Sequence, residues 1–472
     1  MKRYWTLLIS LVFSLFSSAQ VFDVETIKYE GDDDKRINLV ILGDGYQTSE
    51  LDQFVTDATS FTTELFSQSP FSEYIDYFNV YAVKVPSNES GADHPATAID
   101  VTEPLTPIAT ADTYFNSTFD SFGFHRLLFY GIDWPSSNIA RSKIISVLAD
   151  NFPAYDSALI LVNSTVYGGS GGEFPMSSMA TSANEIAIHE LGHSLFNLLD
   201  EYYPGDGRLR EDINSTQESD PSLIKWKNWL NDEGVGVYAY GTSGEAATWN
   251  RPHQNCKMRY LGRDFCAVCK EGMIEKIHDL VSPVDSFSPN NVTPVENPSF
   301  PIDFELNLIK PNPNSLESVW TLNGITIGNN IDMVSLSAID LLEGSNTLTS
   351  VVTDNSPMLR VDNHETVHVN TVTWTINYSA LSIDDIDAKS NSYTISLYPN
   401  PTNAILNFKF ESNTDTDIKV NITSVDGKLL QSLTLSSYRT KEIDISNFRS
   451  GIYIANFFAN NTLLTSRKIV KN

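Results

Sequence analysis

The chain has 472 residues, of which 41% are hydrophobic, and a formal net charge of −28. At roughly 100–200 residues per domain this length suggests two to four domains, and the hydrophobic content excludes a wholly disordered chain. The negative charge argues against binding to nucleic acid or to an anionic membrane surface, because both repel a polyanion.

The first 19 residues predict a secretory signal peptide. Lys2 and Arg3 form a positive start, an apolar core runs from Leu7 to Phe16, and small residues end at Ala19. The apolar run is shorter than the roughly 20 residues that cross a bilayer, and no later segment qualifies as a span. We therefore expect an exported protein without a membrane span.

Residues 20–285 predict an α/β domain. The continuous apolar run from Ile37 to Tyr46 is typical of a buried strand. A helical pattern capped by Thr48 or Ser49 follows, and Tyr77 to Val85 is a second strand. A strand, a helix and a strand at this spacing indicate parallel pairing. A further helix and the strand from Ser157 to Ser164 repeat the pattern.

The HExxH pattern, which is the spacing of a zinc protease, occurs twice. One copy is His189, Glu190 and His193, and the other runs from His364 to His368. On a helix, residues i and i+4 lie about 6 Å apart on one face, so two imidazoles can converge on one zinc ion. On a strand the same residues lie about 13 Å apart.

The copy at His364 lies in an alternating run rich in β-branched residues. Val367 and Val369 would face one way, and His368 and Asn370 the other. This pattern predicts a strand, which would hold the two imidazoles too far apart for one ion. We interpret this copy as exposed strand residues without a metal site.

The first copy lies in a helical pattern that begins near Asn184, and Gly192 would let this helix pack closely against a neighbour. Asn197 tolerates the left-handed conformation that ends a helix, and a turn there could bring Asp200 back as a third zinc ligand. We expect Asp200, and not the adjacent Glu201, to be the ligand. A buried histidine pair in a core helix is the alternative.

Three cysteines, Cys256, Cys266 and Cys269, lie in one short stretch. In an oxidising compartment we expect two of them to pair and one to remain free, with the pairing left open. A structural zinc site with His253 as the fourth ligand is the alternative.

Two β-rich domains follow. The Pro-, Asn- and Ser-rich segment 282–301 predicts a linker. Residues 286–385 show short alternating strands typical of an immunoglobulin-like β-sandwich. Residues 386–472 predict a last β-sandwich, with a hairpin at Asp426 and Gly427.

The stretch HELGHSLFNLLDEYY, preceded by YGGSGG and followed by CKMRYLG, resembles the bacterial metallopeptidase family named for immunoglobulin A peptidase. That family is similar to the metzincins. The resemblance covers about residues 30–285, including INLVILGDGY, ESGADHP and DNFPAYDSALILVNS. It implies a metzincin-like α/β catalytic domain, in which a mixed sheet supports an active-site helix.

The resemblance also implies roles for single residues, with Zn²⁺ as the cofactor. The zinc ligands would be His189, His193 and Asp200, and the general base would be Glu190. Met258 would form the methionine turn beneath the metal. Tyr260 would ligate zinc or hydrogen-bond the transition state, unless it is only a packed loop aromatic. The YGGSGG segment would be either an edge strand that pairs with an extended peptide or a flexible turn.

The fragments ISLYPNPTNAILNF, VDGKLLQ, SGIYIANF and RKIVKN resemble, in this order, the sorting domain of type IX secretion substrates. This resemblance implies export by the type IX machinery of a Gram-negative bacterium, to the medium or the cell surface, with removal of the domain. A carbohydrate-binding sandwich is the alternative for this region.

Together these expectations describe an exported, monomeric zinc endopeptidase that acts on extended polypeptides. Two alternatives remain open. One is a non-catalytic surface binding protein on a peptidase fold, and the other is a zinc hydrolase of non-peptide bonds.

Overall fold

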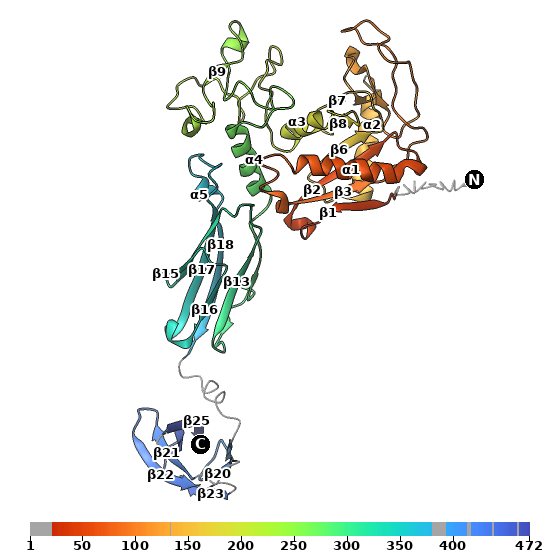
Figure 1. The fold of residues 1–472 in the computed structure, drawn as a ribbon. Coiled ribbons are helices and arrows are strands. Elements are labelled where there is room, and N and C mark those ends of the chain that lie inside the picture. Colours follow the sequence, from red (N-terminus) through yellow and green to blue (C-terminus); the bar gives the residue numbers. More distant parts are fainter. Residues whose placement is uncertain (1–20, 133, 380–392, 413–416, 437–438, 460–461) are drawn as a thin grey trace, which may run out of the picture.

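The computed structural model describes residues 21–132, 134–379, 393–412, 417–436, 439–459 and 462–472, so the predicted signal peptide lies outside the described residues. Three regions follow one another along the chain (Figure 1). The first is mixed α/β, and the other two consist mostly of strands. In the described part of the chain, no helix is both long and apolar enough to cross a membrane.

The first region is built on a six-stranded mixed sheet. Its strands, in spatial order, are β1 (Val24–Lys28), β3 (Phe78–Val83), β2 (Ile37–Asp44), β6 (Ser157–Val162), β8 (Met176–Ser178) and β7 (Gly169–Ser170). β2 pairs in parallel with both β3 and β6, which confirms the predicted parallel pairing. The two outermost strands, β1 and β7, are antiparallel to their neighbours.

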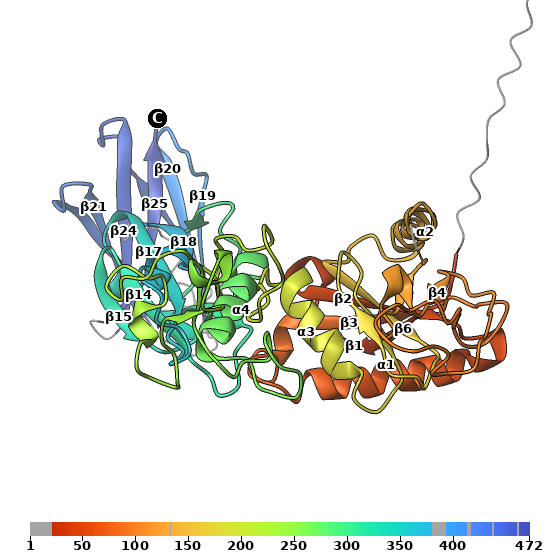
Figure 2. The same cartoon turned by 90° about the horizontal axis from the view of Figure 1, so that it is seen from above.

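Helices cover both faces of this sheet, because successive side chains of a buried strand point to opposite faces. Ile37, Leu39 and Ile41 of β2 belong to the core under α1 (Leu51–Leu65), α3 (Asn184–Ser194) and α4 (Ala267–Leu280). Val40 and Leu42 belong to the core under α2 (Ser136–Asn151), which lies on the opposite face (Figure 2).

The predicted cap of α1 is wrong. Thr48 and Ser49 lie inside a short 3-10 turn, and the capping box is formed by Gln47 and Glu50. A glutamine side chain can cap this turn because its oxygen accepts a hydrogen bond from a free backbone N–H of the first turn.

Shorter elements complete the first region. Two small hairpins pair β4 (Ser117–Thr118) with β5 (Phe129–Tyr130) and β9 (Tyr238–Ala239) with β10 (Asn250–Arg251). The 3-10 turns of the described residues are Asp33–Lys35, Thr48–Glu50, Ile75–Tyr77, Ser121–Gly123, Lys227–Trp229, Glu245–Ala247 and, in the middle region, Ala338–Asp340.

The middle region consists of two sheets that share one core, in which the rings of Trp320 and Trp374 stack. One sheet has the order β11 (Val284–Ser288), β13 (Ile302–Leu308) and β16 (Met333–Leu336). The other has the order β12 (Val295–Glu296), β18 (Asn370–Tyr378), β17 (Gly344–Asp354), β14 (Leu316–Leu322) and β15 (Ile325–Asn329). The predicted linker 282–301 is therefore wrong in part, because β11 and β12 form within it.

The last region has two sheets around a core that includes Phe408 and Phe457. One sheet has the order β19 (Tyr393–Tyr398), β20 (Ile405–Ser412) and β23 (Arg439–Asp444). The other has the order β22 (Leu429–Leu435), β21 (Ile418–Ser424), β24 (Gly451–Ala459) and β25 (Thr462–Lys471). The predicted hairpin is confirmed, since β21 pairs antiparallel with β22 and Gly427 has a φ of 82° in the turn between them.

Candidate metal centre

Helix α3 carries the first HExxH copy on one side and core residues on the other. Ile188 and Leu191 are fully buried in the core, which fixes the rotation of the helix. A Cβ at Gly192 would lie only 2.9 Å from Sδ of Met258, so the glycine lets the helix rest directly on that buried side chain. The predicted close neighbour of Gly192 is therefore Met258.

The chain turns sharply after α3. Asn197 has a φ of 58°, which confirms the predicted left-handed conformation. The N–H of Leu198 donates to the carbonyl of Gly192 at 2.9 Å and closes the turn. This reversal brings Asp200 back over the helix, beside His189 and His193.

Three donor atoms form a nearly equilateral triangle. Nε2 of His189 lies 3.2 Å from Nε2 of His193, and each of these nitrogens lies 3.2 Å from Oδ1 of Asp200. Donors that lie 2.0–2.1 Å from a tetrahedral zinc ion are separated from each other by about 3.3–3.4 Å. The triangle therefore has the size of one face of a zinc coordination tetrahedron.

The other ring nitrogens of the two histidines are held by backbone carbonyls. Nδ1 of His189 lies 3.0 Å from the carbonyl oxygen of Lys257, and Nδ1 of His193 lies 2.5 Å from that of Leu198. A carbonyl only accepts, so both Nδ1 atoms carry the proton and both Nε2 atoms can offer a lone pair. Metal-binding histidines are commonly oriented in this way.

The electrostatics of the triangle favour a carboxylate at Asp200. Burial opposes its charge, but the contacts of its Oδ1 with Nε2 of His189 and of His193 outweigh burial and hold the pKa of Asp200 well below its usual range. For His193, burial favours the neutral ring, yet the hydrogen bond and charge of Asp200 raise the net pKa. A metal cation between these groups would replace the proton that the raised pKa keeps on His193.

Glu190 lies next to the triangle without being part of it. Its Oε2 is 3.9 Å from Nε2 of His193, and burial raises the pKa of its carboxyl group. A Cβ at Gly171, just after β7, would lie 2.0 Å from the same oxygen, so a side chain there would displace the carboxylate. The glycine-rich segment thus makes room for Glu190.

Two cavities meet at Glu190 and Tyr202, which line both. One cavity has a volume of about 780 Å³, and its walls include His189, Arg126 and Leu261. The other has a volume of about 420 Å³ and is also lined by His193, Asp200 and Arg208. An extended chain laid across Glu190 would occupy both cavities.

Tyr202 and Tyr260 differ in their surroundings. Tyr202 lines both cavities, and burial together with the charge and hydrogen bond of Asp200 raises the pKa of its hydroxyl. Tyr260 is 48% exposed, and its ring lies under the guanidinium of Arg259 at 4.8 Å. The tyrosine that lines both cavities is therefore Tyr202, whereas the family resemblance implied either a role at the metal or a packed loop position for Tyr260.

β7 is the outermost strand of its sheet, yet its free side is partly occupied. The N–H of Gly169 donates to the carbonyl of Arg126 at 3.2 Å, and the N–H of Leu128 donates to the carbonyl of Gly169. Oγ of Ser170 donates to the carbonyl of Leu128. A peptide could therefore pair only with the chain beyond Ser170.

The strand predicted for the second HExxH copy is wrong. His364–Val367 is the helical turn α5, His368 ends it, and β18 starts only at Asn370. The two imidazoles are mostly buried, with side-chain exposures of 7% and 9%, and their ring centroids are 5.5 Å apart. Buried contacts with α4 override the β-branched pattern of the local sequence.

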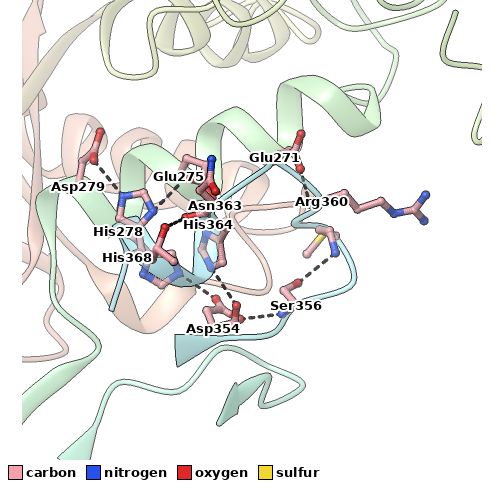
Figure 3. A network of polar contacts seen from close by, with 12 residues as sticks. Glu271, Glu275, His278, Asp279, Asp354, Ser356, Arg360, Asn363, His364 and His368 are labelled. Carbon is pink, nitrogen blue, oxygen red and sulfur yellow. Dashed lines mark hydrogen bonds and ion pairs between the residues drawn. The ribbon is translucent and has the colours of Figure 1, made fainter. Parts of the chain in front are cut away.

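These two histidines contact acceptors on both ring nitrogens (Figure 3). His364 bonds through Nδ1 to Glu275 and through Nε2 to the carbonyl of Asp354 at 2.9 Å. His368 places Nδ1 2.9 Å from Glu275 and Nε2 3.0 Å from Asp279. Nδ1 of His368 lacks hydrogen-bond geometry to Glu275 at that distance, whereas the partners of His364 only accept, so both nitrogens of His364 carry protons and leave no lone pair for a metal. The absence of a metal at this copy stays a prediction, now for this reason.

The predicted disulfide is not formed, because all three cysteines are free and buried. Sγ of Cys256 and Sγ of Cys269 lie 3.7 Å apart. The fourth group beside them is Glu201, which is fully buried. His253, the fourth ligand of the alternative, instead accepts from the N–H of Asn255. Because Glu201 belongs to this cluster, a substitution there would not be silent.

Two parts of the chain match known protein families. Residues 26–235 match the IgA Peptidase M64 family, and residues 396–472 match the secretion system C-terminal sorting domain. Both resemblances inferred from the sequence are confirmed. The first match includes α3 and Asp200 but ends before Met258. Together the matches indicate a secreted peptidase, exported by type IX secretion to the medium or the cell surface.

No curated protein matches the chain. Among solved structures, the dimeric latent PorU from Porphyromonas gingivalis is 16% identical, over 40% of this chain and 20% of that one, with a TM-score of 0.16. A Parabacteroides merdae beta-glucuronidase is 9% identical, over 48% of this chain and 28% of that one, also with a TM-score of 0.16. The chain thus spans less than a third of either protein, and scores this low carry no argument about fold or function.

Several features of the site were not predicted from the sequence. They are the carbonyl of Lys257 that holds His189, the contact between Gly171 and Glu190, and the burial of Glu201 among the cysteines. Only the last had a signal in the sequence, since Cys266 and Cys269 have the two-residue spacing of many zinc sites.

Proposed function

We propose that the chain is a secreted zinc endopeptidase. The observation that carries the proposal is the triangle of His189, His193 and Asp200, with edges of 3.2 Å, at the junction of two cavities. A nitrogen, nitrogen and oxygen donor set with room for a fourth ligand suits a catalytic zinc ion. The family match, to peptidases, supports the same conclusion.

His189, His193 and Asp200 would hold the ion. Bound zinc would acidify a water molecule and polarise the scissile carbonyl. Glu190 would accept a proton from the attacking water and deliver it to the leaving amine, and its raised pKa suits both steps. Tyr202 would donate a hydrogen bond to the oxygen on which negative charge develops. We assign this last role to Tyr202 rather than to Tyr260 because Tyr202 lines both cavities.

The remaining regions fit the same proposal. Residues 20–285 would form a metzincin-like catalytic domain, residues 286–385 an immunoglobulin-like β-sandwich, and residues 386–472 the sorting domain. The exported protein would act as a monomer on extended polypeptides. The two cavities on either side of Glu190 support an extended substrate, because they offer space in two directions from the base.

Casein hydrolysis tests this function. The purified protein should cleave casein, lose the activity in a metal chelator and regain it when zinc is added. A protein that holds zinc but cleaves neither casein nor a mixed peptide library would contradict the proposal. Binding without cleavage would favour the surface binding protein, and cleavage confined to esters or other non-peptide bonds would favour the second alternative.

A further inference from the structure

A second group of potential metal ligands lies beneath the candidate catalytic site. Glu201, Cys256, Cys266 and Cys269 each place a donor atom within 4.8 Å of the other three. All four are buried, with exposed fractions of 0%, 0%, 7% and 0%. They come from the turn after α3, the loop before Met258 and the start of α4, so the fold brings three distant segments to one point.

Three of the six donor–donor distances within the group are close to those of a tetrahedral site. Sγ of Cys256 and Cys269 are 3.7 Å apart, and Oε1 of Glu201 lies 3.3 Å from Sγ of Cys269 and 3.7 Å from Sγ of Cys266. With Zn–S of about 2.3 Å and Zn–O of about 2.1 Å, a tetrahedral zinc ion separates two sulfurs by about 3.8 Å and a sulfur from an oxygen by about 3.6 Å. A disulfide would need about 2.05 Å between the sulfurs.

Glu201 supplies an independent observation. Its Oε2 is buried and has no hydrogen-bond partner among the described residues. The side-chain amide of Asn214 lies 3.4 Å from Oε1, which is long for a hydrogen bond. A buried carboxyl with an unpartnered oxygen among three weakly donating thiols is costly. A divalent cation would satisfy it.

The surroundings also favour thiolates. The N–H of Cys266 donates to Sγ of Cys256 at 3.2 Å. Cys266 is the N-cap of the 14-residue helix α4 and Cys269 lies in its first turn, where the helix dipole favours negative charge.

We propose that Glu201, Cys256, Cys266 and Cys269 bind a second zinc ion with a structural role. Three thiolates and a carboxylate fill a tetrahedron, which leaves no open position for substrate, and soft sulfur ligands select zinc over magnesium or calcium. Binding would release the thiol protons. The proposal does not depend on whether the chain cleaves peptides.

The second ion would hold the parts of the first site in place. Glu201 follows Asp200 directly, and its N–H donates to the carbonyl of Met258 at 2.7 Å. Cys256 precedes Lys257, whose carbonyl orients His189. One structural ion would thus fix both the turn that carries Asp200 and the loop that positions His189.

The test counts metal ions and thiols in the protein purified from its native culture without chelator. We expect two zinc ions per chain by elemental mass spectrometry, and three free thiols after unfolding in chelator. The double variant His189→Ala with His193→Ala should keep one zinc ion. Replacing that ion with Co²⁺ should give the near-ultraviolet charge-transfer absorption of cobalt bound to thiolate.

Two matched variants identify the fourth ligand. Glu201→Gln should weaken zinc binding at the second site at least 10–100-fold, because even residues behind a ligand contribute this much. His253→Ala should keep both ions. One thiol per chain instead of three, or a histidine double variant without zinc, would overturn the proposal. So would equal zinc binding in Glu201→Gln and the native protein, even if the cysteine variants fail to fold.

Discussion

Asp200 shows how one backbone conformation can complete a site. The left-handed turn at Asn197 returns the chain so that Oδ1 lies 3.2 Å from both imidazoles. The sequence allowed this inference because asparagine is one of the few residues that adopt that conformation at low cost. The sequence could not show that Glu201, one residue further on, points to the opposite side into a buried cluster.

Asp200→Ala should lower zinc affinity at the catalytic site at least 100-fold. Loss of a residue that only supports a ligand lowers metal affinity about 10–100-fold, and this substitution removes a direct ligand. Asp206→Ala is the matched control, because Asp206 is a nearby carboxylate whose hydrogen bond goes to Tyr203 instead. Isothermal titration of both variants after metal removal measures the effect. Equal affinities in the two variants would show that Asp200 is not a ligand.

Tyr202→Phe should lower kcat/KM about 10²–10³-fold, the usual loss when one donor to the developing oxyanion is removed. Tyr260→Phe should change it by less than about threefold, because Tyr260 lies on the exposed side under Arg259. Zinc content should stay the same in both variants. A larger loss in Tyr260→Phe would restore the role that the sequence resemblance implied for that residue.

At the scale of elements, the strands and helices of the first sheet could be predicted because continuous apolar runs and helical spacing are strong signals. The segment around His364 could not, because its β-branched residues favour a strand while its contacts are non-local. His364 and His368 face Glu275 and Asp279 of α4, about 90 residues away in the chain. The linker prediction failed for a similar reason, since β11 gains its stability from pairing with β13.

The contact between α4 and α5 should depend on pH. Burial disfavours the charged form of His364. Its hydrogen bonds to Glu275 and Asp354 and the charges of these two residues outweigh burial and raise the pKa of His364 in the folded state. His278 and His368 also face it. A raised folded pKa gives stability that is complete below the ordinary value of 6.5 and is lost as the pH rises through the folded value.

We therefore expect the melting temperature to fall as the pH rises above about 6.5, the ordinary pKa of histidine, and to fall less in His364→Gln. At pH 6, that variant should be about 1–3 kcal/mol less stable, because a partly buried carboxylate loses its donor. Casein hydrolysis at pH 6 should persist, since His364 is not part of the metal triangle. Identical pH profiles of the two melting temperatures would contradict this account of the contact.

At the scale of the whole molecule, the order of three regions could be predicted from shifts in composition. Their association could not, because it rests on single side chains from distant segments. Asp354, at the end of β17, accepts from Tyr74 at 2.6 Å and from His278 at 2.8 Å. The charge pattern of the sequence gave no sign of this contact between the first and middle regions.

The sorting domain should be absent from the exported protein. The resemblance to type IX sorting domains implies removal of the domain during export, so the mature chain should lack about the last 80 residues, one small domain. Intact-mass measurement on protein from the culture medium or cell surface tests this, with protein expressed in the cytoplasm of another host as the control. A native C-terminus at Asn472 would show that export leaves the domain in place.

The most direct test of the central claim is the turnover of a quenched fluorescent peptide by Glu190→Gln and by the native protein at equal zinc content. Glu190 is 3.9 Å from Nε2 of His193 and is not a corner of the metal triangle, so its replacement should leave zinc binding intact. The account predicts that kcat falls at least 10²–10⁴-fold, the contribution of a general base. A variant that keeps its zinc and cleaves the peptide at the native rate would contradict it.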